Sequence, residues 1–191
     1  MNPITATKIN LYKNITFGNQ NKNTPNTLKA TLENLKNTNQ NIDIFIKAVS
    51  NNEKLSNIKI KNFLAQGSSA IVFETEDNRI LKLTKGNHFP LNRPPEEFDV
   101  PILKKGKIGK IHYYIEEKLY QHGLSEPFVE EIKAKIKNKG YKTFDIYDGD
   151  INQIGLSKDG KLYLLDPECA KYKTIFHAIF DKFKKFISKK L

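Results

Sequence analysis

Residues 147–170, YDGDINQIGLSKDGKLYLLDPECA, carry acidic side chains on both sides of the turn SKDG. Asp148 comes before a short strand-like run, and Asp166 ends the alternating run that follows the turn. An aspartate in the first loop can orient a hydroxyl group and accept its proton. A second aspartate, together with the carboxamide oxygen of Gln153, can hold Mg²⁺ against nucleotide phosphates. The pattern therefore predicts a catalytic loop and a metal-binding loop joined by a β-hairpin.

Two other interpretations of this stretch stay open. A calcium-binding loop would use Asp148, Asp150 and Asn152 at its first, third and fifth positions and Asp159 at its twelfth. Such a loop requires glycine where this chain has Gln153, a bidentate glutamate at the twelfth position, and a helix rather than a strand after it. The second alternative is a polar β-turn with solvated acids. Asp150 is the second candidate for the acid that orients the hydroxyl.

A loop and a lysine earlier in the chain fit the same chemistry. The run LAQGSSAIVFETEDNRILKL predicts strands around a turn whose tip holds Gly67, Ser68 and Ser69. Small residues at such a tip let backbone N–H groups approach phosphate oxygens. Lys82 stands between two leucines in a strand and therefore points away from them. We expect Lys82 to contact phosphates; the alternative is an ordinary hairpin with a solvated lysine.

Several strands, one helix and a hairpin must position these residues. The helix is predicted over SEPFVEEIKAKIKNKG, with Ser125 as its N-cap, Pro127 in its first turn and Gly140 closing it. The run KKGKIGK is predicted as a turn. Strands are predicted over IKIKNFLAQG, SAIVFETED, RILKLT and HYYIEEKL. This order of elements indicates an α+β fold.

The two ends of the chain differ from this central part. Residues 1–57 are predicted as a flexible N-terminal segment with short helices, because residues 1–26 are rich in Asn, Thr and Lys. Leu28, Leu32 and Leu35 share one face of a helix in this segment. The run TIFHAIFDKFKKFISKKL predicts a basic amphipathic helix that ends a domain of residues 58–191. We expect its apolar face to pack on the domain, with a membrane surface or a partner as the alternative.

The composition limits the classes of function. The 191 residues suit one domain with an appendage, and 32 Lys and Arg against 21 Asp and Glu give a net charge of +11, which attracts polyanions. Cys169 is the only cysteine, which excludes a disulfide framework and a cysteine zinc site. No run approaches the ~18 apolar residues of a membrane span. The N-terminus lacks the apolar region of a Sec signal peptide.

Taken in order and spacing, the motifs of residues 58–172 resemble those of the protein kinase-like fold. GSSAIVFE is similar to the glycine-rich loop, and ILKLT is similar to the third strand with its phosphate-binding lysine. YIEEKL is similar to the fifth strand and hinge, whose backbone meets adenine. IYDGDINQIGL and LLDPECA are similar to the catalytic loop and the D-F-G segment. The resemblance implies a small bilobal kinase-like fold with a truncated C-terminal lobe.

The resemblance also implies ATP and Mg²⁺ as cofactors. It gives catalytic roles to Lys82, Asp148 and Asp166, and metal binding to Asp166 and Gln153. The residues that it assigns to nucleotide binding are Gly67, Ser68, Ser69, Lys82, Glu97 and Glu116. We expect the charged groups at positions 82, 148 and 166 to converge around one triphosphate-sized cleft.

The chain departs from the kinase pattern at several positions. Ile146 replaces the histidine of H-R-D, and Pro167–Glu168 replaces Phe–Gly. Gln153 replaces the metal-binding asparagine, with Asn152 as an alternative ligand. A short helix after Lys82 would offer Glu96 or Glu97 as its ion-pair partner, and we favour Glu97. Because little chain follows Asp166, we expect activity without activation-loop phosphorylation.

This short plan resembles the type III effector kinases of bacterial pathogens. The HopBF family, which phosphorylates and inactivates a eukaryotic heat-shock chaperone, is the first choice, and the OspG and NleH effectors are the second. The resemblance implies a monomeric kinase, for Ser or Thr rather than Tyr, that is secreted through a type III system and acts on a host protein in the host cytoplasm. A kinase-fold AMP transferase and an inactive pseudokinase are the alternatives. A nucleic-acid binder is disfavoured, because no helix-turn-helix signature is present.

Overall fold

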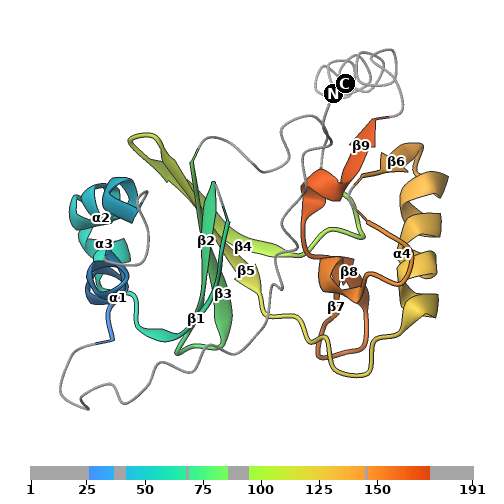
Figure 1. Ribbon diagram of the computed structural model, residues 1–191, viewed down its shortest axis with the longest axis horizontal. Coiled ribbons are helices and arrows are strands. Elements are labelled where there is room, and N and C mark those ends of the chain that lie inside the picture. Colours follow the sequence, from blue (N-terminus) through green and yellow to red (C-terminus); the bar gives the residue numbers. More distant parts are fainter. Residues whose placement is uncertain (1–25, 37–41, 68, 86–94, 145, 173–191) are drawn as a thin grey trace, which may run out of the picture. The chain divides into compact units, whose positions relative to one another are not determined.

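The computed structural model describes residues 26–36, 42–67, 69–85, 95–144 and 146–172. The chain divides into two compact units, whose elements are labelled in Figure 1. The first unit comprises Met1–Gly86 and Ile102–Lys118, and the second comprises Asn87–Pro101 and Leu119–Leu191. Helices and an antiparallel five-stranded sheet occur together, in agreement with the predicted α+β class.

The first unit contains a sheet with the strand order β1-β2-β3-β5-β4. Its strands are β1 (Ile60–Gln66), β2 (Ala70–Thr75), β3 (Arg79–Lys85), β4 (Ile102–Ile108) and β5 (Ile111–Glu117). The four strands predicted from β-prone runs bounded by turn residues correspond to β1, β2, β3 and β5. Each of them contributes buried residues to the core of this unit.

β4 corrects one prediction. Residues 104–110 were predicted as a turn, but most of them belong to β4, which pairs with β5, and the turn itself is confined to Gly109 and Lys110. Gly109 has a φ of +56°, the left-handed conformation that glycine adopts readily. β4 lies at the edge of the sheet and exposes Lys104, Lys105 and Lys107. Charged residues are usual on an edge strand. Because lysines occupy these positions in β4, its sequence lacks the apolar residues by which the inner strands were predicted.

Three helices cover one face of this sheet, α1 (Leu28–Asn34), α2 (Ile42–Ser50) and α3 (Glu53–Ser56) (Figure 1). Leu28, Leu32 and Leu35, predicted on one helical face, are all buried. They share a core with Phe73 of β2 and Leu81 of β3. We expected a division at residue 57 between an N-terminal segment and a domain; the helices on one side of that position and the sheet on the other form a single core.

The second unit is built around one helix and two short β-ladders, each a pair of antiparallel strands. Helix α4 (Glu126–Asn138) begins after Ser125, has Pro127 in its first turn, and is followed by Gly140 with a φ of +84°, as predicted. Ser125 occupies the N-cap position, but its side chain makes no capping hydrogen bond. β6 (Tyr141–Thr143) pairs with β9 (Ala170–Tyr172), and the predicted hairpin pairs β7 (Ile154–Leu156) with β8 (Leu162–Leu164).

The core of the second unit lies between α4 and the ladders. Val129, Ile132 and Ile136 follow helical spacing and are fully buried, as are Ile154 and Leu164 of the hairpin. Residues 98–100 add a further stretch of backbone beside β8, with the Val100 N–H donating to the Leu164 carbonyl at 3.0 Å. The hairpin is therefore fixed from two sides.

Within the described ranges, no helix is both long enough and apolar enough to cross a bilayer. The predicted flexible residues 1–25 and the predicted C-terminal basic helix lie outside the described residues, as does Ser68.

Candidate active site

Lys82 lies in the middle of β3 in the first unit. Leu81 and Leu83 on either side of it are fully buried in the core that the helices cover. Because side chains alternate along a strand, Lys82 belongs to the opposite face, and it is half-buried there. Its cross-strand neighbours on that face are Val72 of β2 and Tyr114 of β5. The ammonium group is therefore carried by an inner strand with apolar groups on both sides.

The tip of the β1–β2 hairpin carries the predicted phosphate loop. The Gly67 N–H donates to the Ala70 carbonyl at 2.8 Å, and the Lys85 N–H donates to the Ser69 carbonyl at 2.7 Å. The Gly67 amide thus closes the turn.

The two glutamates predicted to bind nucleotide lie in different units. Glu116 is buried in β5, where its backbone lies between Ile80 of β3 and Ile102 of β4. Glu97 belongs to the second unit, in a turn rather than a helix, and its carboxylate lies 3.3 Å from the Lys139 ammonium. The described part of the predicted short helix, residues 95–100, is not helical, and its remainder lies outside the described residues. An ion pair of Glu97 with Lys82 stays a prediction.

In the second unit, the two acidic loops connect the same two ladders. The first loop runs from β6 to β7 and carries Asp148; the second runs from β8 to β9 and carries Asp166. At one end, the Phe144 N–H donates to the Cys169 carbonyl at 2.7 Å. At the other end, the Leu165 N–H donates to the Gln153 carbonyl at 2.8 Å. Because both ends are hydrogen-bonded, the two loops run beside each other.

Asp148 is exposed at the turn of the first loop and is held by one lysine. Its side chain is 89% exposed, and its Oδ1 accepts a short hydrogen bond from Lys133 of α4, whose side chain is only 16% exposed. Lys133 also donates to Glu130 at 2.9 Å. The hydrogen bond from Lys133 holds the pKa of Asp148 below its usual range, and Asp148 in turn raises the pKa of Lys133. Asp148 is therefore ionised at neutral pH and accessible to solvent.

Asp150, the second candidate for the hydroxyl-orienting acid, has a structural role. It is the N-cap of the 3₁₀ turn Ile151–Gln153, and its Oδ1 accepts from the backbone N–H of Asn152 at 3.1 Å and from Nδ2 of Asn152 at 2.8 Å. These bonds fix the carboxamide of Asn152 as well. Oε1 of Gln153, by contrast, is buried and has no hydrogen-bond partner among the described residues.

Asp166 begins the second loop as the N-cap of the 3₁₀ turn Pro167–Cys169. Its Oδ1 accepts from the Glu168 N–H at 3.0 Å. The half-buried side chain therefore keeps one orientation, with Oδ2 making no hydrogen bond in the part of the chain that the structure describes. A carboxylate fixed in this way is suited to holding a cation.

These groups fit a magnesium ion bound mainly through phosphate and water. Mg²⁺ takes one or two protein oxygens beside its nucleotide and water ligands, and Asp166 and Gln153 offer one oxygen each. A buried carboxamide oxygen without a partner is costly unless a ligand completes its bonding. No set of three or more His, Cys, Asp and Glu side chains in the described ranges is grouped to hold a metal alone, and three acids of the alternative calcium loop, Asp148, Asp150 and Asp159, each accept other hydrogen bonds. Asp159, its twelfth position, instead accepts a hydrogen bond from Ser157 in the β7–β8 turn.

Two side chains, Gln121 and Ile146, hold the first loop; the sequence singled out Ile146 but not Gln121. Nε2 of Gln121 lies 3.2–3.3 Å from the carbonyl oxygens of Ile151, Asn152 and Ile154. Ile146, where the kinase loop has its histidine, is buried in the core of the second unit. The loop is thus anchored by packing and by Gln121. No sequence signal identifies Gln121, because it lies 30 residues or more from the carbonyls that it contacts.

No protein-family model matches this chain, and no curated protein matches it in sequence. The sequence resemblance and the geometry of each unit are therefore the basis for a functional assignment. Lys82 belongs to the first unit, and Asp148 and Asp166 belong to the second. Their convergence on one nucleotide stays a prediction.

Proposed function

We propose that this protein transfers the γ-phosphate of ATP to a hydroxyl group of a protein. The observation that carries the proposal is the pair of hydrogen-bonded acidic loops in the second unit, one with the exposed Asp148 and the buried carboxamide oxygen of Gln153, the other with Asp166 fixed as the cap of a turn. Phosphoryl transfer needs such a division, because one acid must meet the acceptor hydroxyl while oxygen ligands hold the metal-bound phosphates.

Each acid of the second unit has its own part in this reaction. Asp148 orients the acceptor hydroxyl and takes its proton; its exposure lets the hydroxyl reach it, and its low pKa keeps it in the ionised form that accepts a proton. Asp166 and Gln153 hold Mg²⁺. When bound, the ion neutralises charge on the β- and γ-phosphates. The structural role of Asp150 as a cap favours Asp148 as the hydroxyl-orienting acid.

The first unit supplies the nucleotide contacts. Lys82 draws on the α- and β-phosphate oxygens, and the hinge after β5 meets the adenine through its backbone. The backbone at the tip of the β1–β2 hairpin covers the phosphates. Val72 and Tyr114, which flank Lys82 in the sheet, support the proposal because apolar neighbours strengthen the attraction between an ammonium group and a phosphate.

The biological setting is part of the same proposal. A minimal effector kinase would act in the host cytoplasm on a host protein, with a heat-shock chaperone as the first candidate substrate. The resemblance to the HopBF family supports this setting.

Labelling with radioactive ATP tests the enzyme hypothesis. The protein is incubated with γ-labelled ATP, Mg²⁺ and a eukaryotic lysate, and it is compared with Asp166→Ala and with Asp159→Asn, a control at the turn of the same hairpin. We expect Asp166→Ala to reduce labelling by about 100-fold or more and Asp159→Asn to retain it. Equal labelling by the native protein and Asp166→Ala would defeat the proposal.

Two further measurements separate the alternatives. Mass spectrometry of a modified target distinguishes the mass of a phosphate from that of AMP. Nucleotide binding without turnover, unchanged by Asp148→Asn, would instead indicate a pseudokinase that binds a partner.

A further inference from the structure

A cationic pocket of about 580 Å³ lies in the second unit, where the second half of α4 meets β6. Three lysines line it, Lys133, Lys137 and Lys142, together with one acid, Glu130. The phosphoryl-transfer mechanism uses Lys133 only as a partner of Asp148 and leaves the other two lysines without a role. The pocket is therefore a candidate for a second contact with a ligand.

The charge of Lys133 is already balanced. Its ammonium donates to Glu130 at 2.9 Å and to Asp148, so it faces two carboxylates. This lysine also joins the pocket to the predicted catalytic aspartate, because it lines the pocket and contacts Asp148 at the same time. A ligand that fills the pocket therefore extends towards Asp148.

Lys137 and Lys142 have no carboxylate partner among the described residues. Neither forms an ion pair with any residue in the described ranges, although Lys135 on the same helix pairs with Glu131 at 2.6 Å. Two unpaired ammonium groups around one hollow attract anions. The positive charge of the pocket is thus available to a ligand.

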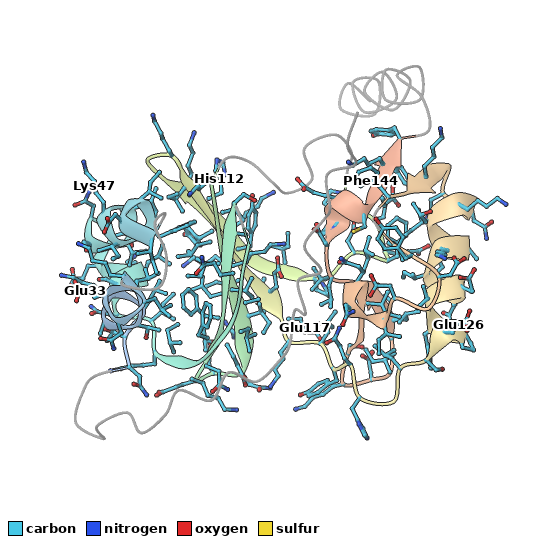
Figure 2. All side chains as sticks on the ribbon, in the orientation of Figure 1. Glu33, Lys47, His112, Glu117, Glu126 and Phe144 are labelled. Carbon is cyan, nitrogen blue, oxygen red and sulfur yellow. The ribbon has the colours of Figure 1, made fainter. Side chains whose placement is uncertain are left out.

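The ladder beside the pocket adds a second observation. Lys142 of β6 lies directly opposite Lys171 of β9, and like charges in this position destabilise a ladder. The Lys171 ammonium lies 3.4 Å from the ring centroid of Phe144, a residue labelled in Figure 2 that is 55% exposed. An exposed aromatic ring beside two lysines gives an incoming chain an apolar contact next to the charges.

We infer that this pocket binds an acidic segment of the protein substrate. The assignment to the substrate rests on the proposed function, because it is Asp148 that would receive the acceptor hydroxyl. A peptide can place a carboxylate at Lys137 and Lys142 and a serine or threonine at Asp148 in one pose. A nucleic acid fits less well, since its regular phosphates would also meet the carboxylates of Glu130 and Asp148.

Fluorescence anisotropy with the full-length protein tests binding directly. The probe is a fluorescein-labelled peptide of about ten residues with one serine flanked by glutamates, and its control has glutamines in place of the glutamates. We expect the acidic peptide to bind about fivefold more tightly or better, and the Lys137→Gln/Lys142→Gln double variant to lose most of that preference. Lys135→Gln, with the same loss of charge per site outside the pocket lining, should stay within about twofold of the native protein.

The outcomes separate this inference from the proposed function. Phosphorylation of both peptides at equal kcat/KM, unaffected by the double variant, would overturn the inference and leave the kinase proposal standing. Acidic-peptide binding that depends on Lys137 and Lys142 without any phosphorylation would keep the pocket and count against the kinase proposal. Equal binding of the two peptides, no binding up to about 1 mM, or tighter binding of a labelled oligothymidine with the same lysine dependence would each overturn the inference.

Discussion

The two units use buried and exposed carboxylates for different purposes. In the first unit, Glu74 of β2 is 4% exposed and accepts hydrogen bonds from Lys118 at 2.8 Å, Lys61 at 2.9 Å and Asn62 at 2.9 Å. In the second unit, Asp148 is exposed on a loop and is held by Lys133 alone among the described residues. The three donors to Glu74 connect strands of the sheet. The single donor to Asp148 leaves that carboxylate exposed to solvent.

This difference separates a carboxylate that holds the fold together from the one to which we assign a catalytic role. The first unit has a continuous sheet under three helices. Ion pairs of Glu74 with Lys61 and Lys118 connect β2 to β1 and to the residue after β5. The second unit has short ladders that hold two loops, which is the usual arrangement of a site carried by a rigid scaffold. Substitutions at the two carboxylates should therefore affect different properties of the protein.

The largest effect is expected on activity in the second unit. Asp148→Asn should lower kcat/KM by about 100-fold or more, because the acid that meets the hydroxyl is lost, with little change in thermal stability. Asp150→Asn keeps a side-chain oxygen that can cap the 3₁₀ turn, and it should cost less than about tenfold in activity. Steady-state kinetics and thermal melting of both variants check this. A greater loss in Asp150→Asn would reverse the assignment.

The next effect is expected on the stability of the first unit. Burial alone would raise the pKa of Glu74, but hydrogen bonds from Lys118, Asn62 and Lys61 outweigh it and lower the pKa from 4.5 to about 2. A shift of that size corresponds to roughly 3 kcal/mol of unfolding free energy. Because the folded pKa is depressed, this stability is present above pH 4.5 and is lost as the pH falls towards 2.

Glu74→Gln should therefore destabilise the protein at neutral pH by about 1–3 kcal/mol and flatten the acid limb of its stability profile. Urea unfolding at several pH values measures both quantities. Glu76→Gln, at an exposed position two residues later, serves as the control and should change neither. A profile for Glu74→Gln that stays parallel to the native one would show that the acid limb has another origin.

A smaller effect separates two glycines, one in each unit. A Cβ added to Gly155 of β7 would lie 2.6 Å from Cβ of Leu119, which is fixed to the backbone. A Cβ added to Gly106 of β4 would lie 2.5 Å from the far end of the Tyr113 ring, which can turn away. Gly155→Ala should cost about 1–3 kcal/mol of unfolding free energy and Gly106→Ala less than about 1 kcal/mol. Equal costs by denaturant titration would contradict this comparison.

The smallest effect concerns the pH dependence of activity. Lys133→Gln removes the hydrogen bond that lowers the pKa of Asp148, so that pKa should rise towards its ordinary value. Since Asp148 acts ionised, the acid limb of the pH–rate profile should move to higher pH, while kcat at neutral pH changes by less than about threefold. Lys135→Gln on the same helix provides the control. An unmoved acid limb, measured with the glutamine peptide, would exclude Lys133 as a positioning residue.

Much of the local structure was predictable from the sequence, and the failure at β4 has a clear cause. β2 and β3 bury alternate or continuous apolar residues, and α4 buries Val129, Ile132 and Ile136 at helical spacing. β4 exposes its lysines on an edge, so nothing in its pattern distinguishes it from a turn. Asp148, Gln153 and Asp166 were predicted as site residues from their order in the sequence, and the separate roles proposed for them rest on their hydrogen-bond partners in the structure.

The sequence by itself determined β1, β2, β3 and β5, the helix α4 and the hairpin between the two acidic loops, because β-prone runs, apolar periodicity and turn residues act over a few neighbouring positions. Only the tertiary structure decided that Asp150 is a cap, that the oxygen of Gln153 is buried without a partner among the described residues, and that Lys133 and Gln121 hold the first loop. Those contacts join residues 15 and 30 positions apart. They depend on how α4 and the ladders pack, which no local pattern specifies.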